Sequence, residues 1–221
     1  MPKKRKPSKR KLLPVLHIFC EGEKTEPNYF HGYINKCFPG NRRLKIIKIE
    51  KTKKNTPIQL VEEAVKMKKS RTTPKGDVFW VVYDRESTAK YTEQNHQSAL
   101  QKARTNNVKV ALSNVCFEIW ILLHFVDGPP CYSSFDDLLS NSALKTKLAE
   151  QGIKDYSKSD RELFKKLEDK IPQARERAAR LNAQSLESAA KNTEPFALNP
   201  YTDVYLVLDE IDKFGSKSPE K

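Results

Sequence analysis

The sequence predicts an α/β fold in which a parallel sheet is sandwiched between helices. Two continuous apolar runs, residues 13–20 and 77–83, are bounded by charged residues, as is typical of strands buried on both faces. Segments with helical spacing separate these runs from two further strand-like segments. Strand and helix alternate over about 100 residues, which is the order expected of a doubly wound (Rossmann-like) parallel sheet.

Four strands and three helices are expected to alternate in this core, at residues 13–20, 25–37, 44–49, 56–69, 77–83, 91–105 and 108–112. The first helix tolerates Pro27, because the first turn of a helix makes no use of the missing N–H. The strand at 44–49 partly alternates apolar and charged residues, which places it nearer the edge of the sheet. Thr56 and Pro57 are typical of a helix start, and they open the second helix. The third helix is polar and is expected to cover the sheet through a narrow stripe.

Helical patterns replace this alternation after residue 115, and they are expected at residues 115–125, 134–151, 159–170, 172–191 and 200–214. We therefore expect four parts: a disordered basic arm (1–11), an α/β catalytic core (12–130), a helical extension packed on the core (131–214) and a disordered tail (215–221). The charged span 154–191 is either a projecting helical hairpin that follows a phosphate backbone or a solvated helix face. The second interpretation is preferred, because acidic residues balance the basic ones.

The chain is strongly basic. It carries a formal charge of +13 over 221 residues; seven positive charges lie within the first 11 residues, and the remainder still carries about +6. A protein that is basic even without its N-terminal arm favours nucleic acid, another anionic polymer or an acidic protein surface as the partner. A solubilising tail is the simpler explanation of the arm, and nucleic-acid binding is preferred over it.

The cysteines indicate reduced thiols. Cys20, Cys37, Cys116 and Cys131 show no CxxC spacing and follow no secretory signal pattern, so neither a zinc knuckle nor a disulfide framework is indicated. No apolar stretch reaches the roughly 20 residues that a membrane helix needs. We therefore expect a cytoplasmic protein with no membrane partner.

Acidic residues directly follow the two buried strands. Glu21 comes after the first strand, and Asp84 and Glu86 come after the second. The carboxyl ends of parallel strands meet at one edge of a sheet, where α/β proteins place their chemistry. Carboxylate oxygens suit Mg²⁺ or Mn²⁺, which can assist phosphodiester cleavage. The sequence therefore predicts a metal site held by Asp84 and Glu86, whose spacing on an extended backbone aims both side chains to one side.

Glu21 is predicted to ligate the metal through water or to act as a general acid or base. Gly22 would let the chain turn sharply at the sheet edge, and Glu23 and Glu26 are nearby reserves. The alternative is a charged turn before a helix N-terminus, where the helix dipole favours acids. The pairing of two acidic elements on similarly placed strands favours the metal site.

Three more charged residues are candidates for the same site. Glu118 falls in the first turn of the helix after the fourth strand, so it is either a dipole-favoured acid or a further catalytic carboxylate. Lys24 and Arg85 flank the acids, and they either contact a phosphate of the nucleic acid or simply neutralise the cluster.

The helix that carries Glu118 is expected to be mainly structural. Ser113 or Asn114 is expected to cap it, and its large apolar residues are expected to belong to the core. His124 lies on this apolar helix and is expected to be a hydrogen-bonded structural histidine.

The usual signatures of several enzyme classes are missing from the sequence. It contains no Walker A loop, GxGxxG fingerprint, HExxH helix or GxSxG elbow. Nucleotide hydrolysis, dinucleotide binding, zinc proteolysis and serine hydrolysis therefore lack their usual support.

Four ordered blocks resemble the RloB-like family of bacterial abortive-infection and antiphage defence proteins. They are FCEGEKTEPNYF at residues 19–30, the acidic element at 84–86, SNVCFEIWILLHF at 113–125 and NPYTDV at 199–204. The resemblance implies a Toprim-like catalytic domain, the metal-dependent module of topoisomerases, primases and overcoming-lysogenisation-defect nucleases. In that pattern Glu21 falls on the glutamate after the first strand and Asp84 on the first aspartate of a DxD element, whereas Glu86 replaces the second aspartate. The family also implies an ABC-type or AAA-type ATPase partner.

The first hypothesis is therefore a Mg²⁺-dependent (or Mn²⁺-dependent) nuclease that cuts RNA, tRNA included, or DNA in antiphage defence. Glu21, Asp84 and Glu86 would form its metal site, with Glu118 supporting them. The rival is a non-catalytic toxin or adaptor that binds nucleic acid or its ATPase partner through the basic surface. A primase-like nucleotidyl transferase would share the metal site but would need nucleoside triphosphates. The sequence leaves open whether the chain forms a homo-oligomer.

Overall fold

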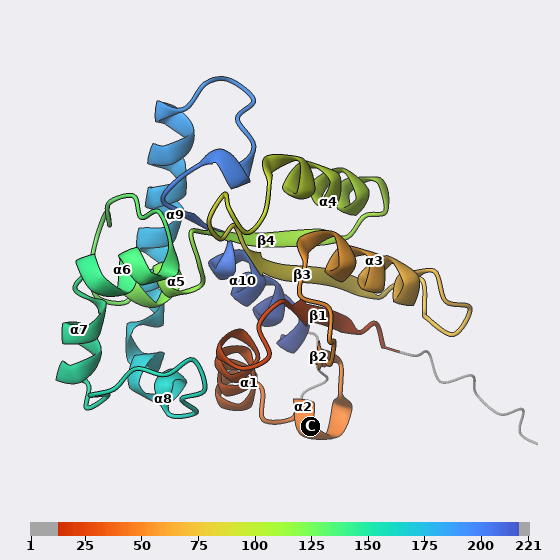
Figure 1. The fold of residues 1–221 in the computed structure, drawn as a ribbon. Helices are drawn as coiled ribbons and strands as arrows, with labels where there is room; N and C mark the ends of the chain where they lie inside the picture. The colour runs from red at the N-terminus through yellow and green to blue at the C-terminus, as the bar shows by residue number, and fades with distance from the viewer. Residues whose placement is uncertain (1–12, 217–221) are drawn as a thin grey trace, which may run out of the picture.

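A computed structural model describes residues 13–216 (Figure 1). The predicted arm at 1–11 and the last five residues of the predicted tail, 217–221, lie outside the described residues. Within the described part, the final helix continues to Gly215, one residue past the predicted boundary.

A mostly parallel sheet forms the centre of the fold. Its strands are β1 (Leu16–Cys20), β2 (Ile47–Glu50), β3 (Val78–Asp84), β4 (Lys109–Asn114) and β5 (Tyr201–Thr202), in the spatial order β2-β1-β3-β4-β5. The first four strands are parallel, and β5 runs antiparallel to β4. The predicted parallel-sheet α/β core is thus confirmed as a mixed α/β fold with helices on both faces.

The helices are α1 (Thr25–Cys37), α2 (Asn41–Leu44), α3 (Pro57–Lys68), α4 (Glu93–Thr105), α5 (Glu118–Leu123), α6 (Phe135–Asn141), α7 (Leu144–Glu150), α8 (Leu163–Leu167), α9 (Ile171–Ser188) and α10 (Val204–Gly215). Two short 3₁₀ helices are η1 (Glu168–Lys170) and η2 (Pro195–Ala197). The predicted bounds of the first helix, 25–37, agree with α1. Thr56 caps α3 by accepting a hydrogen bond from the backbone N–H of Gln59, as its position before Pro57 suggested.

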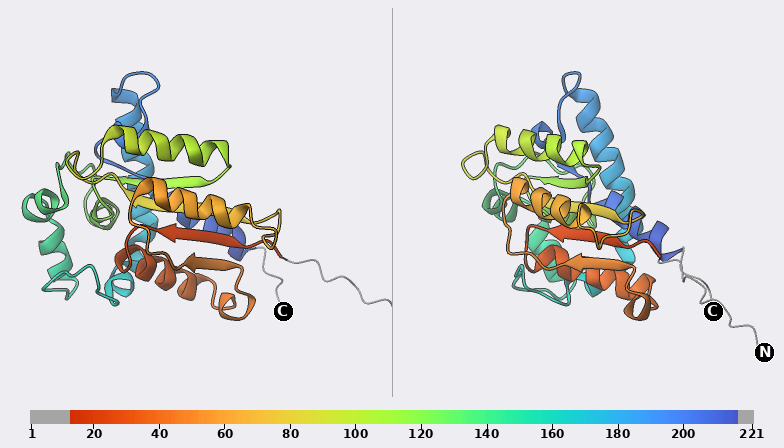
Figure 2. Two further views of the ribbon diagram at one scale, coloured as in Figure 1. Left: turned by 45° about the vertical axis from the view of Figure 1, so that its right-hand side comes forward. Right: turned by 90° about the vertical axis from the view of Figure 1, so that its right-hand side faces the viewer.

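Successive residues of each strand point to opposite faces of the sheet and so belong to two different hydrophobic cores. Ile18 belongs to the core under α1 and α10, and Phe19 belongs to the core under α3 and α4. Figure 2 shows these helix pairs on opposite sides of the sheet. The central strands β1 and β3 are buried on both faces, which explains their unbroken apolar sequence, whereas Lys48 of edge strand β2 is exposed.

The C-terminal part differs from the prediction of a purely helical extension. Residues 201–202 form β5, and α10 starts only at Val204. The outer edge of β5 is covered by Asn182 of α9, whose amide accepts from the N–H of Thr202 (3.0 Å) and donates to its carbonyl (2.9 Å). A two-residue strand has no readable periodicity, and its partners come from distant parts of the chain, so the pattern could not reveal it.

The helix predicted at 115–125 is shorter, because α5 spans only Glu118–Leu123. Ser113 and Asn114 do not cap it; Ser113 bonds the Thr202 hydroxyl at 2.9 Å, and Asn114 donates to the carbonyls of Phe196 and Leu198 at 3.2 and 2.7 Å. Both side chains therefore serve the packing of β4 against the C-terminal segment. The helix predicted at 134–151 is likewise two helices, α6 and α7.

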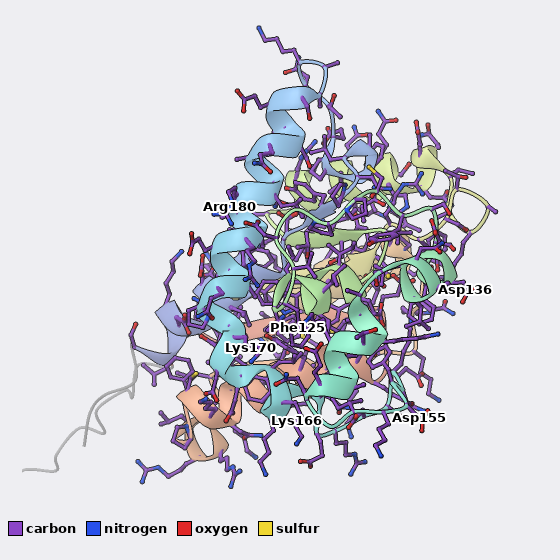
Figure 3. All side chains as sticks on the ribbon, turned by 90° about the vertical axis from the view of Figure 1, so that its left-hand side faces the viewer. Phe125, Asp136, Asp155, Lys166, Lys170 and Arg180 are labelled. Carbon is purple, nitrogen blue, oxygen red and sulfur yellow. The ribbon has the colours of Figure 1, made fainter. Side chains whose placement is uncertain are left out.

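The charged span 154–191 is no projecting hairpin, because α9 packs against α5, β5 and α10. Its arginines are neutralised mainly by acids outside the span, not by the acids within it that the preferred interpretation invoked: Arg175 pairs with Asp209 at 2.9 Å and Arg180 with Asp127 at 2.7 Å. Figure 3 shows Lys166, Lys170 and Arg180 along one side of the molecule. Among residues 13–216, no helix combines the length and the apolar character needed to cross a bilayer.

Candidate metal and phosphate site

The ends of β1 and β3 bring the two acidic elements together. Cys20 lies beside Val82 in the parallel register, and the N–H of Glu21 donates to the carbonyl of Val82 at 2.9 Å. The backbone N–H of Asp84 donates in turn to Glu21 Oε2 at 3.0 Å. The prediction that these residues meet at one sheet edge is therefore confirmed.

A cavity of about 310 Å³ opens at this edge. Carboxylates from four segments of the chain and three lysines line it: Glu21, Glu23, Glu26, Asp84, Glu86, Glu118, Lys24, Lys90 and Lys158. Six acids against three lysines leave the lining acidic in a protein whose formal charge is +13. The cavity is therefore negatively charged although the protein as a whole is positively charged, and it suits a bound cation better than an anion that arrives without a metal.

Asp84 and Glu86 both line the cavity, but not for the predicted reason. Glu86 has a φ of 57°, in the left-handed region, so the backbone is not extended there. Its N–H donates to the carbonyl of Val115 at 2.8 Å, and its carboxylate accepts from Lys90 at 2.6 Å. The hydrogen bond from Glu86 to Val115, which follows β4, therefore accompanies a turn of the chain at Glu86.

Glu118 is the most deeply placed acid, with 1% of its surface exposed. It lies in the first turn of α5, as predicted. Tyr156 donates its hydroxyl to Glu118 Oε1 at 2.8 Å, whereas Oε2 is buried without a hydrogen-bond partner. A buried carboxylate oxygen left unpaired is costly, and a cation in the cavity would satisfy it.

Glu26 joins the site from α1, because its side chain folds back over the turn. Its Oε1 accepts from the N–H of Gly22 at 3.2 Å. A Cβ atom at position 22 would lie 2.1 Å from Glu26 Oε2, so only glycine leaves room for this arrangement.

Burial raises the pKa values of three of the acids in the cavity, Glu21, Glu26 and Asp84. Burial raises the pKa of Glu21 to about 7, despite the hydrogen bond from Asp84 and the charge of Lys90. Burial, and then the charges of Glu26, Glu21 and Glu118, hold the pKa of Asp84 well above its usual range. The pKa of Glu26 is also raised, mainly by burial. Carboxylates in this condition gain most from a divalent cation.

The two predicted cationic contacts are placed differently. Lys24 lines the cavity, whereas Arg85 is buried beside a second cavity of about 330 Å³. The Arg85 guanidinium donates to the carbonyls of Phe196 (3.1 Å) and Tyr91 (2.9 Å). The prediction that Arg85 contacts a phosphate beside the carboxylates is therefore not supported by this geometry.

Four residues of the site were not singled out from the sequence. Tyr91 donates its hydroxyl to Glu21 Oε1 at 3.1 Å and also contacts the carbonyl of Asn55, while Lys90 holds Glu86. The other two are Tyr156 and Lys158, from the segment between α7 and α8. Lys90 and Tyr91 lie close to Glu86 in sequence, which weakly indicates that they belong to the site. Nothing in the sequence around Tyr156 and Lys158 indicates this for them.

His124 is structural, as predicted. Its Nδ1 lies 2.9 Å from the carbonyl of Trp120, and its Nε2 lies 3.1 Å from the Tyr29 hydroxyl. It is buried, and burial lowers its pKa to about 4. The neighbouring aromatic residues Phe117 and Trp120 are buried in the core, also as predicted.

The donor set fits a hard divalent cation. Glu21, Asp84, Glu86 and Glu118 offer carboxylate oxygens, the ligands that Mg²⁺ and Mn²⁺ prefer. Within residues 13–216, however, no group of three or more histidine, cysteine or acidic side chains is placed so that it could hold a metal ion. Binding a cation here would require the carboxylates to move closer together or water molecules to bridge them to the metal.

A comparison with protein families matches the model of the RloB-like protein family to residues 16–211. No curated protein and no solved structure shows a significant match to the chain.

Proposed function

The chain belongs to the RloB-like family, and from its carboxylate cavity we propose that it is a metal-dependent nuclease with a Toprim-like site. The observation that carries this proposal is the convergence of six acids from separate segments on one cavity of a basic protein. A basic body attracts a polyanion, and an acidic cavity within it suits a metal that acts on a phosphodiester.

Asp84 and Glu86 would hold the metal, with Glu21 beside them and Glu118 supporting them through its unpaired Oε2. Bound Mg²⁺ or Mn²⁺ would supply neutralisation of the phosphate charge and a more acidic water.

Glu21 is suited to moving a proton. The Asp84 N–H and the Tyr91 hydroxyl fix its two oxygens at 3.0 and 3.1 Å, so its orientation is set before substrate arrives. Burial raises its pKa to about 7 before any metal binds, so the carboxyl group can accept and return a proton near neutral pH. Lys90, 2.6 Å from Glu86, holds that carboxylate at the cavity.

The biological setting follows from the family resemblance. We propose that the chain is the effector of an abortive-infection system and that an ABC-type or AAA-type ATPase supplies the nucleotide switch. The carboxylate site would then cleave no nucleic acid until the ATPase partner responds to infection.

The test compares the parent protein with Glu21→Gln and Asp84→Asn, with Glu187→Gln on the exposed face of α9 as the matched control. Each is incubated with labelled DNA, total RNA and tRNA, with the ATPase partner, in Mg²⁺, Mn²⁺ or EDTA. We expect cleavage only with metal, a loss of at least about 100-fold in the two site variants, and no change in Glu187→Gln. Equal cleavage by all four proteins, or none by any, would refute the nuclease.

Within residues 13–216, no three side chains are placed to hold a metal ion, and this favours the second candidate, a non-catalytic adaptor that binds nucleic acid or the ATPase. This candidate predicts salt-sensitive binding without a metal requirement and unchanged toxicity of Glu21→Gln in cells.

A further inference from the structure

Through Lys158, the segment 151–162 between α7 and α8 contributes to the wall of the carboxylate cavity. It belongs to the predicted helical extension, not to the predicted catalytic core at 12–130. Thr25 Oγ1 at the start of α1 donates to the carbonyl of Lys158 at 2.9 Å, and Tyr156 donates to Glu118 Oε1 at 2.8 Å. Two hydrogen bonds therefore attach this wall to the ends of α1 and α5.

Lys158 places an ammonium group at the cavity that forms a long ion pair but no hydrogen bond among residues 13–216. Its Nζ lies 3.9 Å from Glu118 Oε1, beyond hydrogen-bonding distance, and Tyr156 already donates to that oxygen. Among residues 13–216, the ammonium donates no hydrogen bond. Lys90 differs, because its Nζ donates to Glu86 at 2.6 Å.

The position of Lys158 is nevertheless defined. Its Nζ lies 4.1 Å from the centre of the Phe135 ring, a cation–π contact, and its carbonyl is held by Thr25. Lys24, at the same cavity, is exposed and has no comparable anchor. The ammonium itself is thus held beside the Phe135 ring and Glu118, while its N–H groups donate no hydrogen bond within residues 13–216 and can serve a ligand that accepts hydrogen bonds.

Neutralising Glu118 is the simpler role for Lys158. The Lys158 side chain is 48% exposed and that of Glu118 is 1% exposed, so the ammonium, 3.9 Å away, offsets part of the charge of a buried carboxylate without donating a hydrogen bond to it. The ammonium can therefore also bind a phosphate oxygen while the carboxylates face the metal.

We propose that Lys158 contacts the phosphate group of the polynucleotide that is cut, so that the helical extension supplies a residue of the active site. The inference rests on the proposed nuclease function. Lys158 forms and breaks no covalent bond; its ammonium donates hydrogen bonds to a non-bridging phosphate oxygen and stabilises the charge that develops there.

The test uses Lys158→Met, with Lys154→Met as the matched control, since Lys154 is exposed in the same segment and does not line the cavity. Binding of fluorescent phosphorothioate RNA and DNA oligonucleotides is measured by anisotropy in Mn²⁺ over a range of salt. We expect Lys158→Met to weaken binding about tenfold and to lower the salt slope by about one, as for the loss of one phosphate contact. Lys154→Met should change the dissociation constant less than about twofold.

Titration with Mn²⁺ alone separates substrate contact from a structural role. The Lys158 ammonium is positively charged and repels Mn²⁺, whereas methionine carries no charge. Lys158→Met should therefore bind the metal as tightly as the parent does, or more tightly. Weaker Mn²⁺ binding would show that Lys158 only supports the cavity wall, and equal oligonucleotide binding by the two methionine variants would exclude the contact. Either result overturns the inference.

The outcomes also separate this inference from the proposed function. If the parent cleaves unmodified oligonucleotides with Mn²⁺ and the ATPase partner, and Lys158→Met binds the phosphorothioate oligonucleotide as Lys154→Met does, the nuclease proposal stands and the Lys158 contact fails. If the parent binds oligonucleotides but cleaves none under these conditions, the nuclease proposal fails first. A parent that binds no oligonucleotide overturns both.

Discussion

Glu21 Oε2 accepts a hydrogen bond of 3.0 Å from the backbone N–H of Asp84, which joins the ends of β1 and β3. Because the donor is backbone, a substitution of the Asp84 side chain leaves Glu21 in place. The two residues can therefore be tested separately: one substitution removes charge from the cavity, and the other alters the side chain that this hydrogen bond orients.

Asp84→Asn should separate the stability of the protein from its affinity for metal. Asp84 is buried among like charges that raise its pKa, so without metal the variant should be at least as stable as the parent at pH 8. Mn²⁺ should raise the melting temperature of the parent, by mass action worth about 2.7 kcal/mol at 100 times the dissociation constant, and EDTA should reverse this. Thermal melts of both proteins with and without Mn²⁺ check the expectation, and an equal Mn²⁺ effect in Asp84→Asn would contradict it.

Gly22→Ala should displace Glu26 while leaving the fold intact. The new Cβ would lie 2.1 Å from Glu26 Oε2, at the end of a flexible side chain that can move away and give up its hydrogen bond from Gly22. We expect Mn²⁺ affinity to fall by about tenfold, or about 1.4 kcal/mol, with little change in melting temperature. Gly40→Ala is the control, since nothing lies within 4 Å of a Cβ there. Identical Mn²⁺ titrations for the two variants would disprove the displacement.

Gly32→Ala should destabilise the contact between α1 and α8. The added Cβ would lie 2.4 Å from Phe164 Cγ and 2.8 Å from its Cβ, close to the backbone of α8, where little movement is available. Overpacking of this kind costs about 1–3 kcal/mol, which exceeds the gain in helix propensity. Urea unfolding of Gly32→Ala and Gly40→Ala measures the difference. No loss of stability relative to Gly40→Ala would mean that α8 does not pack against α1 this closely.

Asp203 should make stability depend on pH. Burial raises its pKa to about 6 from its ordinary value of 3.8, although Tyr201 donates a hydrogen bond to it at 2.8 Å. Between these two values the folded state binds more protons than the unfolded state, so this contribution to stability is full below about pH 4 and is lost as the pH rises through 6.

Asp203→Asn removes that titration. The stability of the variant relative to the parent should therefore rise by about 2 kcal/mol between pH 4 and pH 7.5. Urea unfolding of both proteins at several pH values measures this difference, in which the contributions of all other groups cancel. A difference that does not change with pH would show that Asp203 titrates normally in the fold.

Much of the fold and part of the site could be predicted from local pattern. The apolar runs before Glu21 and Asp84 indicated buried parallel strands, and parallel strands place their carboxyl ends on one edge. Glu118 was also foreseeable, because the helix that carries it follows the fourth strand. These features depend on neighbours in sequence, where periodicity is informative.

The sequence by itself determined the α/β core, the family resemblance and the meeting of Glu21, Asp84 and Glu118. Only the tertiary structure decided that β5 completes the sheet, that Glu86 turns into the left-handed region, that Lys158 lines the cavity and that Tyr156 bonds Glu118. The reason is physical: these contacts join residues far apart in the chain, and their geometry is set by packing rather than by the period of any one helix or strand.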